Sequence, residues 1–188
     1  NTRLGFLSTN RYYKNGGYGN LFGTDGWFLL SKNLRFTYEL FLNLNKEPVA
    51  DWIDSDDLIF GRSVALDNQN YIGKSLYFQL YRNTEKWRSY LIYRDFSPNF
   101  QADVGFVVKN NRRWATLYHT YQLFPNKPAL QFLSFGTKAD LVYTYEDYLK
   151  TISVDAILSI KTLFNTEITY TLDFDAFKNF LGRDYRNL

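Results

Sequence analysis

Residues 33–45 read NLRFTYELFLNLN, and apolar and polar side chains alternate along most of this stretch. One parity holds Leu34, Phe36, Tyr38, Leu40, Leu42 and Leu44, and the other holds Arg35, Thr37, Glu39 and Asn43. Successive side chains of a strand point to opposite faces, so this pattern predicts a strand with one apolar face and one polar face. The interior of a soluble sandwich or the hydrocarbon of a membrane would suit the apolar face.

Several other segments repeat this alternation. Residues 151–162 place Ile152, Val154, Ala156, Leu158 and Ile160 opposite Ser153, Asp155, Ser159 and Lys161. Residues 130–146 and 166–173 alternate in the same way, and weaker versions cover 4–9, 21–30, 71–82, 86–94 and 113–124. We expect about nine strands, since helical periodicity is not convincing anywhere.

The predicted connections alternate in length. Long ones cover 10–19, 45–70 and 95–112, and short ones cover 31–33, 83–85, 125–127 and 163–165, with a medium turn at 147–150. This alternation predicts an antiparallel up-and-down sheet whose long loops all emerge at one end. Outer-membrane barrels have this arrangement, whereas a Greek-key sandwich has no reason to maintain it.

Strand length and aromatic content favour the membrane alternative. From Leu34 to Leu44 the chain would span about 36 Å, or about 28 Å along the membrane normal at a tilt near 40°. Aromatic residues make up 20% of the sequence. Trp87, beside a short turn, and Trp114, beside a long loop, are predicted to lie near opposite rims as interfacial aromatics, although both would also suit a sandwich core.

Overall composition excludes several classes of protein. The 188 residues are 45% hydrophobic and carry a net charge of +3 without a basic block, which argues against a nucleic-acid partner. The absence of Cys excludes a disulfide framework. The longest apolar runs, such as residues 27–30, are far shorter than a transmembrane helix requires. The chain begins without Met, and we expect it to be a portion of a longer polypeptide.

Three segments resemble a known family: residues 25–43 (DGWFLLSKNLRFTYELFLN), 93–107 (YRDFSPNFQADVGFV) and 153–177 (SVDAILSIKTLFNTEITYTLDFDAF). They are similar, in the same order, to the C-terminal β-barrel region of bacterial outer-membrane proteins of unestablished function that carry a carbohydrate-binding, family-nine-like domain upstream. The family shows Asn-Pro-Glu before Val-Gly-Phe and Pro-Arg after it. Gln101-Ala102-Asp103 and Val108-Lys109 stand there instead, so no role is transferred to this loop.

The resemblance implies a transmembrane β-barrel in the outer membrane of a Gram-negative bacterium. Residues 1–188 would form a single portion of that barrel, with the upstream domain outside the chain. Single-chain bacterial barrels have an even number of strands, so further strands are also expected outside it.

The sequence offers little catalytic chemistry. The single histidine, His119, shares a parity with Ala115, Leu117, Tyr121 and Leu123, which favours a structural or interfacial role. The acidic stretch DWIDSDD supplies Asp51, Asp54, Asp56 and Asp57 as candidate Ca²⁺ ligands, but its spacing departs from the EF-hand pattern, and a solvated acidic loop is favoured. We expect no enzyme activity, no cofactor and no metal.

The alternation assigns residues to two environments. The predicted lipid-facing residues are Leu34, Phe36, Tyr38, Leu40, Leu42, Ile152, Val154, Leu158, Ile160 and Ile168. The predicted lumen-facing residues are Arg35, Glu39, Lys138, Asp140, Asp155, Lys161 and Glu167, whose charges would either select solutes or pair across strands.

The leading hypothesis is an outer-membrane pore, transporter or scaffold, linked to glycan handling, whose partners are the lipid bilayer and other outer-membrane or periplasmic proteins or glycans. The main alternative is a secreted β-sandwich that binds carbohydrate. An outer-membrane hydrolase is a further alternative, but no acid/base pair stands at a suitable spacing.

Overall fold

The computed structural model describes residues 1–49, 57–59, 61–63, 65–101, 110–125, 127, 129–147, 149–164, 166–180 and 183–185. Side chains are described as far as residue 175, apart from that of residue 59. These parts of the chain contain strands and turns but no helix, and accordingly no helical segment long and apolar enough to cross a membrane.

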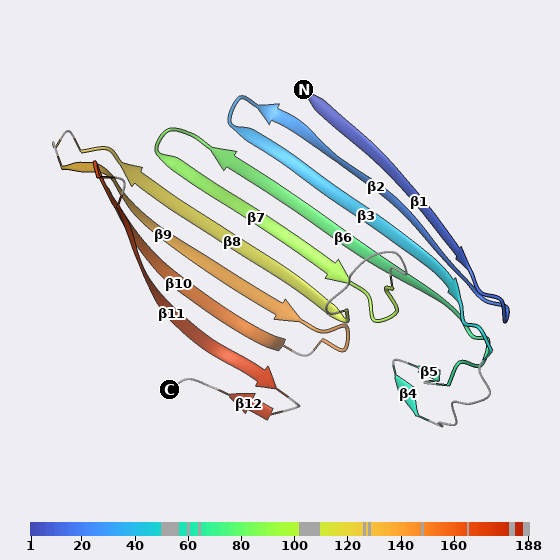
Figure 1. Ribbon diagram of the computed structural model, residues 1–188. Coiled ribbons are helices and arrows are strands. Elements are labelled where there is room, and N and C mark those ends of the chain that lie inside the picture. The colour runs from blue at the N-terminus through green and yellow to red at the C-terminus, as the bar shows by residue number, and fades with distance from the viewer. Residues whose placement is uncertain are drawn as a thin grey trace.

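One curved antiparallel sheet forms almost the whole molecule (Figure 1). Its strand order is β1-β2-β3-β6-β7-β8-β9-β10-β11-β12. The strands are β1 (Thr2–Tyr12), β2 (Tyr18–Ser31), β3 (Leu34–Lys46), β6 (Asn70–Asn83), β7 (Trp87–Phe96), β8 (Arg112–Leu123), β9 (Leu130–Tyr143), β10 (Leu149–Thr162), β11 (Glu167–Phe180) and β12 (Arg183–Tyr185). The two-residue strands β4 (Leu58–Ile59) and β5 (Arg62–Ser63) pair only with each other.

The prediction of an up-and-down antiparallel sheet with about nine strands is confirmed: nine strands are long, and the short β12 was not predicted. The sheet is nevertheless open and not a closed barrel. β1 forms one edge and β12 the other, and the described strands make no pairing between those edges (Figure 1).

The strands are long for a sheet of a soluble domain. β7 has 10 residues, and five of the others have 14. Strands of soluble proteins usually have about 5–6 residues. The 13 residues of β3 span about 43 Å at about 3.3 Å per residue.

The connections confirm the predicted alternation in part. Residues 32–33, 84–86, 124–129 and 163–166 connect strands at one end, which we call the short-turn end. The two longest connections, residues 47–69 and 97–111, lie at the other, the long-loop end. The predicted long connection over 10–19 is wrong, because β1 and β2 continue to Tyr12 and Tyr18 and leave only residues 13–17 between them. Gly16 and Gly17 close this turn with positive φ angles of 75° and 89°, a conformation that glycine adopts without strain.

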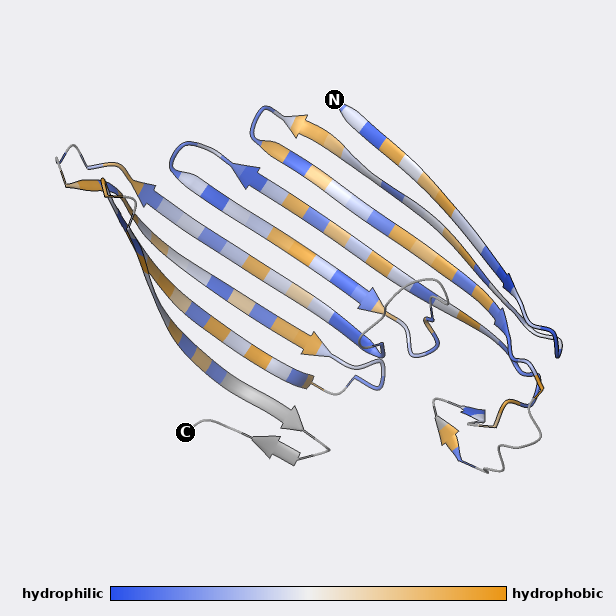
Figure 2. Cartoon of the chain, viewed as in Figure 1, coloured by the Kyte–Doolittle hydropathy of each residue, from blue (hydrophilic) through white to orange (hydrophobic). Residues whose placement is uncertain are grey.

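The strand register sorts the side chains onto two faces. Leu40 lies opposite Thr24 and Leu76, and Leu158 lies opposite Phe135 and Tyr170, so the apolar parity of one strand continues into the next. We call this side the apolar face. The alternate residues, such as Glu39 beside Asp25 and Tyr77, form the polar face. Apolar and polar residues accordingly alternate along most strands (Figure 2).

The burial of side chains is inverted relative to a soluble domain, since polar residues are buried and many large apolar ones are exposed. Among the described residues, the only buried hydrophobic ones are Leu21, Ile92 and Phe100, whereas the buried polar ones include Asn43, Thr116, Thr120, Ser134 and Asp140. Large apolar side chains are exposed instead, as for Phe6 at 85% and Ile168 at 62%. Outside β4 and β5, every described strand belongs to the one sheet, so the sandwich alternative has no second layer there.

Candidate functional site: the polar face and the two rims

The polar face gathers the seven residues predicted to face a lumen. Arg35 and Glu39 lie on it in β3, Lys138 and Asp140 in β9, Asp155 and Lys161 in β10, and Glu167 in β11. Pairing connects several of them directly, since Lys138 lies opposite Asp155 and Lys161 lies opposite Glu167. The ten predicted lipid-facing residues lie together on the apolar face.

Asp140 is the centre of a hydrogen-bonded network on the polar face. Its Oδ1 accepts from Trp114 Nε1 at 2.8 Å and from Thr116 Oγ1 at 2.6 Å. Its Oδ2 pairs with Lys138 Nζ at 2.5 Å, and the same ammonium lies 3.6 Å from Asp155. The carboxylate is buried, and every one of these contacts supports its charge. The network therefore fastens β8, β9 and β10 to one another through side chains.

Trp87 and Trp114 lie near opposite rims as predicted, at the short-turn end and the long-loop end, but their indoles lie on different faces of the sheet. Trp114 is opposite Arg94 and Val142 in the register of the polar face, and Trp87 is opposite Tyr121 on the apolar face. Trp114 directly follows two arginines, and a shift of one residue moves a side chain to the other face, so proximity to a loop could not decide its orientation.

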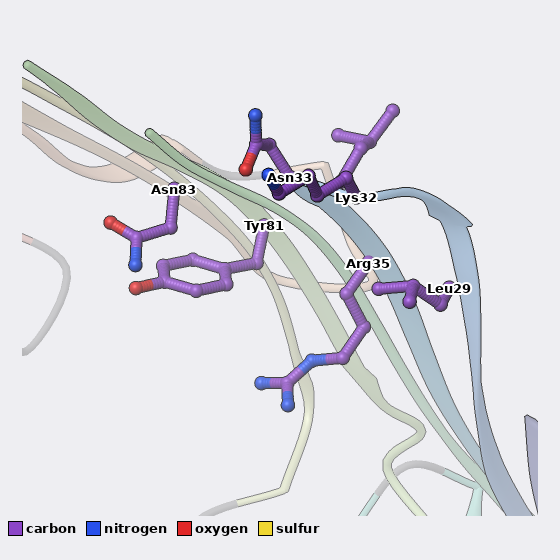
Figure 3. A pocket seen from close by; sticks show the side chains of 7 residues that line it. Leu29, Lys32, Asn33, Arg35, Tyr81 and Asn83 are labelled. Atoms are coloured by element: carbon purple, nitrogen blue, oxygen red, sulfur yellow. The ribbon is translucent and has the colours of Figure 1, made fainter. Parts of the chain in front are cut away.

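Aromatic rings hold three arginines of the polar face. Arg94 lies 5.4 Å from the ring centroid of Tyr77 and 4.8 Å from that of Trp114, while Arg112 lies 5.4 Å from Trp114. Arg35 lies 5.6 Å from the ring of Tyr81. Figure 3 shows the guanidinium and this ring extending to the same side of the sheet. Both line a pocket of about 300 Å³ at the short-turn end. These contacts hold positive charge on the polar face.

The chain after β7 lies against the polar face at the long-loop end. Asn43 is fully buried; its Nδ2 donates to the carbonyl of Asn99 at 3.4 Å, and its Oδ1 accepts from the amide of Gln101 at 3.2 Å. Gly73 leaves room for this segment, because a Cβ there would collide with the backbone of Asn99 and Phe100. Residues 97–101 therefore narrow the space above β3 and β6.

A polar pocket of about 350 Å³ lies beside this segment, with Tyr13, Tyr18, Tyr71 and Gln101 in its lining. Glu47 and Arg62 form an ion pair in it, with 3.2 Å between Oε1 and Nε, and the guanidinium also lies 4.1 Å from the Tyr71 ring centroid. Burial raises the pKa of Glu47 above its ordinary value, and the charge of Arg62 acts in the opposite direction.

An aromatic cluster borders the apolar face at the short-turn end. The ring of Trp87 lies 4.8 Å from that of His119 and 4.4 Å from that of Tyr121. His119 Nδ1 is 2.6 Å from the hydroxyl of Ser89. The sole histidine thus lies between neighbouring strands, in contact with Ser89 and Trp87 of β7.

A second cluster borders the apolar face at the long-loop end. Tyr145 donates a hydrogen bond to Asp95, and Tyr93 donates to the same carboxylate at 3.3 Å. Arg113 lies 4.9 Å from the Tyr145 ring centroid and forms an ion pair with Asp147 at 3.0 Å. Burial, together with the hydrogen bond to Asp95, raises the pKa of Tyr145, so its phenol stays protonated and remains a donor.

The candidate metal ligands Asp51, Asp54 and Asp56 lie outside the described residues. Of the four candidates, only Asp57 is described. Elsewhere in the described chain, Asp, Glu and His residues do not gather in a group of three that could hold a metal ion.

Comparison with known proteins identifies no relative: neither a family model, nor a curated protein, nor a solved structure matches this chain. The family resemblance stays a prediction.

Replacement of Gly73 by Ala is expected to displace residues 97–101, because the added Cβ meets backbone atoms that cannot rotate away. Amide hydrogen exchange at Phe100 and Gln101 should become faster. Gly5→Ala is the matched control, since its Cβ meets only the end of the Asp25 side chain. Unchanged exchange in Gly73→Ala would contradict the description of this contact.

Replacement of Asp140 by Ala should lower the free energy of unfolding by about 2–4 kcal/mol, because it leaves Lys138 and two hydrogen-bond donors without their acceptor. Asp155→Asn is the control, since that carboxylate makes only the longer contact of 3.6 Å with Lys138. Urea titration of both variants measures the difference. Equal losses would show that Asp140 is not the centre of the network.

Proposed function

We propose that this chain forms part of the wall of an outer-membrane β-barrel, with its apolar face against lipid and its polar face lining an aqueous interior. The proposed role is that of a pore, transporter or scaffold in the outer membrane of a Gram-negative bacterium. The proposal assigns no catalytic step to the chain. We also propose that the chain belongs with the outer-membrane proteins that it resembles. An upstream carbohydrate-binding-like domain and a link to glycans are then expected.

The inverted burial carries this proposal. In water, a sheet that exposes Leu, Ile and Phe along the full length of its strands would have a contiguous apolar surface far larger than soluble monomers tolerate. In a bilayer the same surface is satisfied by hydrocarbon, and the buried polar face opposite is what an aqueous interior requires.

Aromatic clusters at both ends of the apolar face support an orientation in which the strands cross the membrane. The Trp87 cluster borders it at the short-turn end, and the Tyr145 cluster borders it at the long-loop end. Rings that combine an apolar body with a polar group are preferred at the two membrane–water interfaces. In outer-membrane barrels the short turns face the periplasm, so the 47–69 and 97–111 loops would face the exterior.

The open edges set a condition on the proposal. Unpaired backbone groups of an edge strand are too costly in hydrocarbon, so β1 and the β11–β12 edge must pair with other strands to complete a barrel. The proposal therefore requires strands beyond those of this sheet.

Migration on gels tests the proposal as a whole. The full-length protein, extracted in detergent, should migrate faster unheated than after boiling, because a folded barrel stays compact in dodecyl sulfate. Recovery of this chain as a folded, soluble monomer without detergent would overturn the membrane assignment and favour a secreted binding module.

Leu40→Arg tests the orientation of the sheet. The change should cost about 2–4 kcal/mol of unfolding free energy in lipid vesicles if Leu40 lies near the bilayer midplane. Glu39→Arg places the same side chain one residue away on the polar face, at an exposed position, and should cost much less. Urea unfolding of both variants in vesicles gives the comparison. Equal costs would contradict the assignment of the two faces.

A further inference from the structure

Arg94 and Arg112 lack a counter-charge in the part of the chain that the structure describes. Neither guanidinium takes part in an ion pair there, although four ion pairs form elsewhere in that part. Both lie near the same indole ring, at 4.8 Å and 5.4 Å from the centroid of Trp114. Two like charges held at one ring repel each other, and no described carboxylate forms an ion pair with either guanidinium.

Among the described residues, the carboxylates that follow bind other groups or lie at a distance from the two arginines. Asp140 uses Oδ1 for Trp114 and Thr116 and Oδ2 for Lys138. Asp95 is adjacent to Arg94 in the chain but points to the other face, where Tyr93 and Tyr145 hold it. Glu39 is two strands away from Arg94 across Tyr77, about 9–10 Å at the usual strand spacing.

A second observation indicates a missing acceptor. Nε of Arg112 is buried and has no hydrogen-bond partner. A buried donor of a charged group is costly to leave unpaired. The neighbouring Arg113 also leaves Nε unpartnered, but its Nη2 reaches Asp147 and the carbonyls of Thr144 and Tyr145.

We propose that Arg94 and Arg112, positioned by the ring of Trp114, form a binding site for a small oxyanion, either a carboxylate or a phosphate group. The guanidinium fork donates parallel hydrogen bonds to two oxygens of such a group, and a bound anion would offset the repulsion between the two arginines. The site lies at the long-loop end of the polar face, and Arg112 also lies 5.9 Å from the ring of Phe96, beside residues 97–101. If the polar face lines a barrel interior, as proposed above, anionic solutes would meet the site where that loop segment narrows the face.

Trp114 supplies a direct reporter. In the full chain, replacement of Trp27, Trp52 and Trp87 by Phe leaves Trp114 as the sole indole. Iodide is an anionic quencher and acrylamide a neutral one, so their ratio reports local anion accumulation at this ring. We expect Arg94→Gln/Arg112→Gln to lower iodide quenching about twofold or more at unchanged acrylamide quenching, because local anion concentration follows local potential.

Arg35→Gln is the matched control. Arg35 is also an arginine of the polar face held by an aromatic ring, but it lies at the short-turn end, far from Trp114. Its replacement should leave iodide quenching of Trp114 unchanged. Equal iodide quenching in the parent and in the double Gln variant would overturn the site.

Competition identifies the chemistry. Inorganic phosphate or acetate should protect Trp114 from iodide better than chloride does at the same ionic strength, and the stronger competitor distinguishes phosphate from carboxylate. Arg94→Lys/Arg112→Lys keeps the charge but removes the fork, so it should retain iodide quenching and lose this protection. If phosphate and acetate protect Trp114 no better than chloride does, the two arginines supply only a general positive potential. That result would overturn the oxyanion assignment. These readouts do not depend on gel migration, so a failed membrane assignment and a failed anion site remain distinguishable.

Discussion

The register of the antiparallel ladder is the constraint on which the rest of this structure depends. Side chains alternate with a period of two, so a slip by one residue in any strand would move its whole apolar set to the other face. β3 and β6 pair without interruption from Leu34 to Lys46, which keeps Phe36 beside Leu80 and Leu44 beside Ile72. Aromatic stacking reinforces this alignment, as between Phe36 and Phe78 at 6.1 Å.

The two faces stabilise the sheet by different means. On the apolar face, neighbouring side chains cover one another only in part and leave a broad surface that needs an apolar medium. On the polar face, hydrogen bonds and ion pairs connect adjacent strands and offset the cost of burying groups such as the Asp140 carboxylate. The apolar face thus depends on its surroundings, whereas much of the polar face is held by contacts within the sheet.

The features that could be predicted from the sequence are those encoded locally. Alternation over residues 33–45 and 151–162 predicted the parity of β3 and β10 correctly, because strand geometry alone determines which residues share a face. The length of the 13–17 connection was predicted wrongly, because it depends on where β1 and β2 end, and nothing in the sequence indicated which face of the sheet Trp114 would join. Strand boundaries follow from pairing with the neighbour, which composition does not reveal.

The contacts that could not be predicted join segments far apart in the chain. Asn43 and Gly73 carry no signal that they receive residues 97–101, since this contact follows from folding of a loop back over the sheet. Similarly, Lys138, Asp140 and Asp155 were recognised as charges of one parity, but their connection to Trp114 requires the pairing of β8 with β9.

Charge on the polar face is distributed according to these pairings. Lys138 forms ion pairs with Asp140, two residues along the same strand, and with Asp155, which strand pairing places opposite it on β10. Arg94 and Arg112 occur on β7 and β8 opposite aromatic residues, so the ladder supplies rings and not carboxylates. A charge in an ion pair uses its hydrogen-bonding groups on the partner and holds the two strands together. A guanidinium that stacks on an aromatic ring keeps its N–H donors available for another group. The same ladder therefore builds a structural region across β9 and β10 and leaves a region with free binding capacity across β7 and β8.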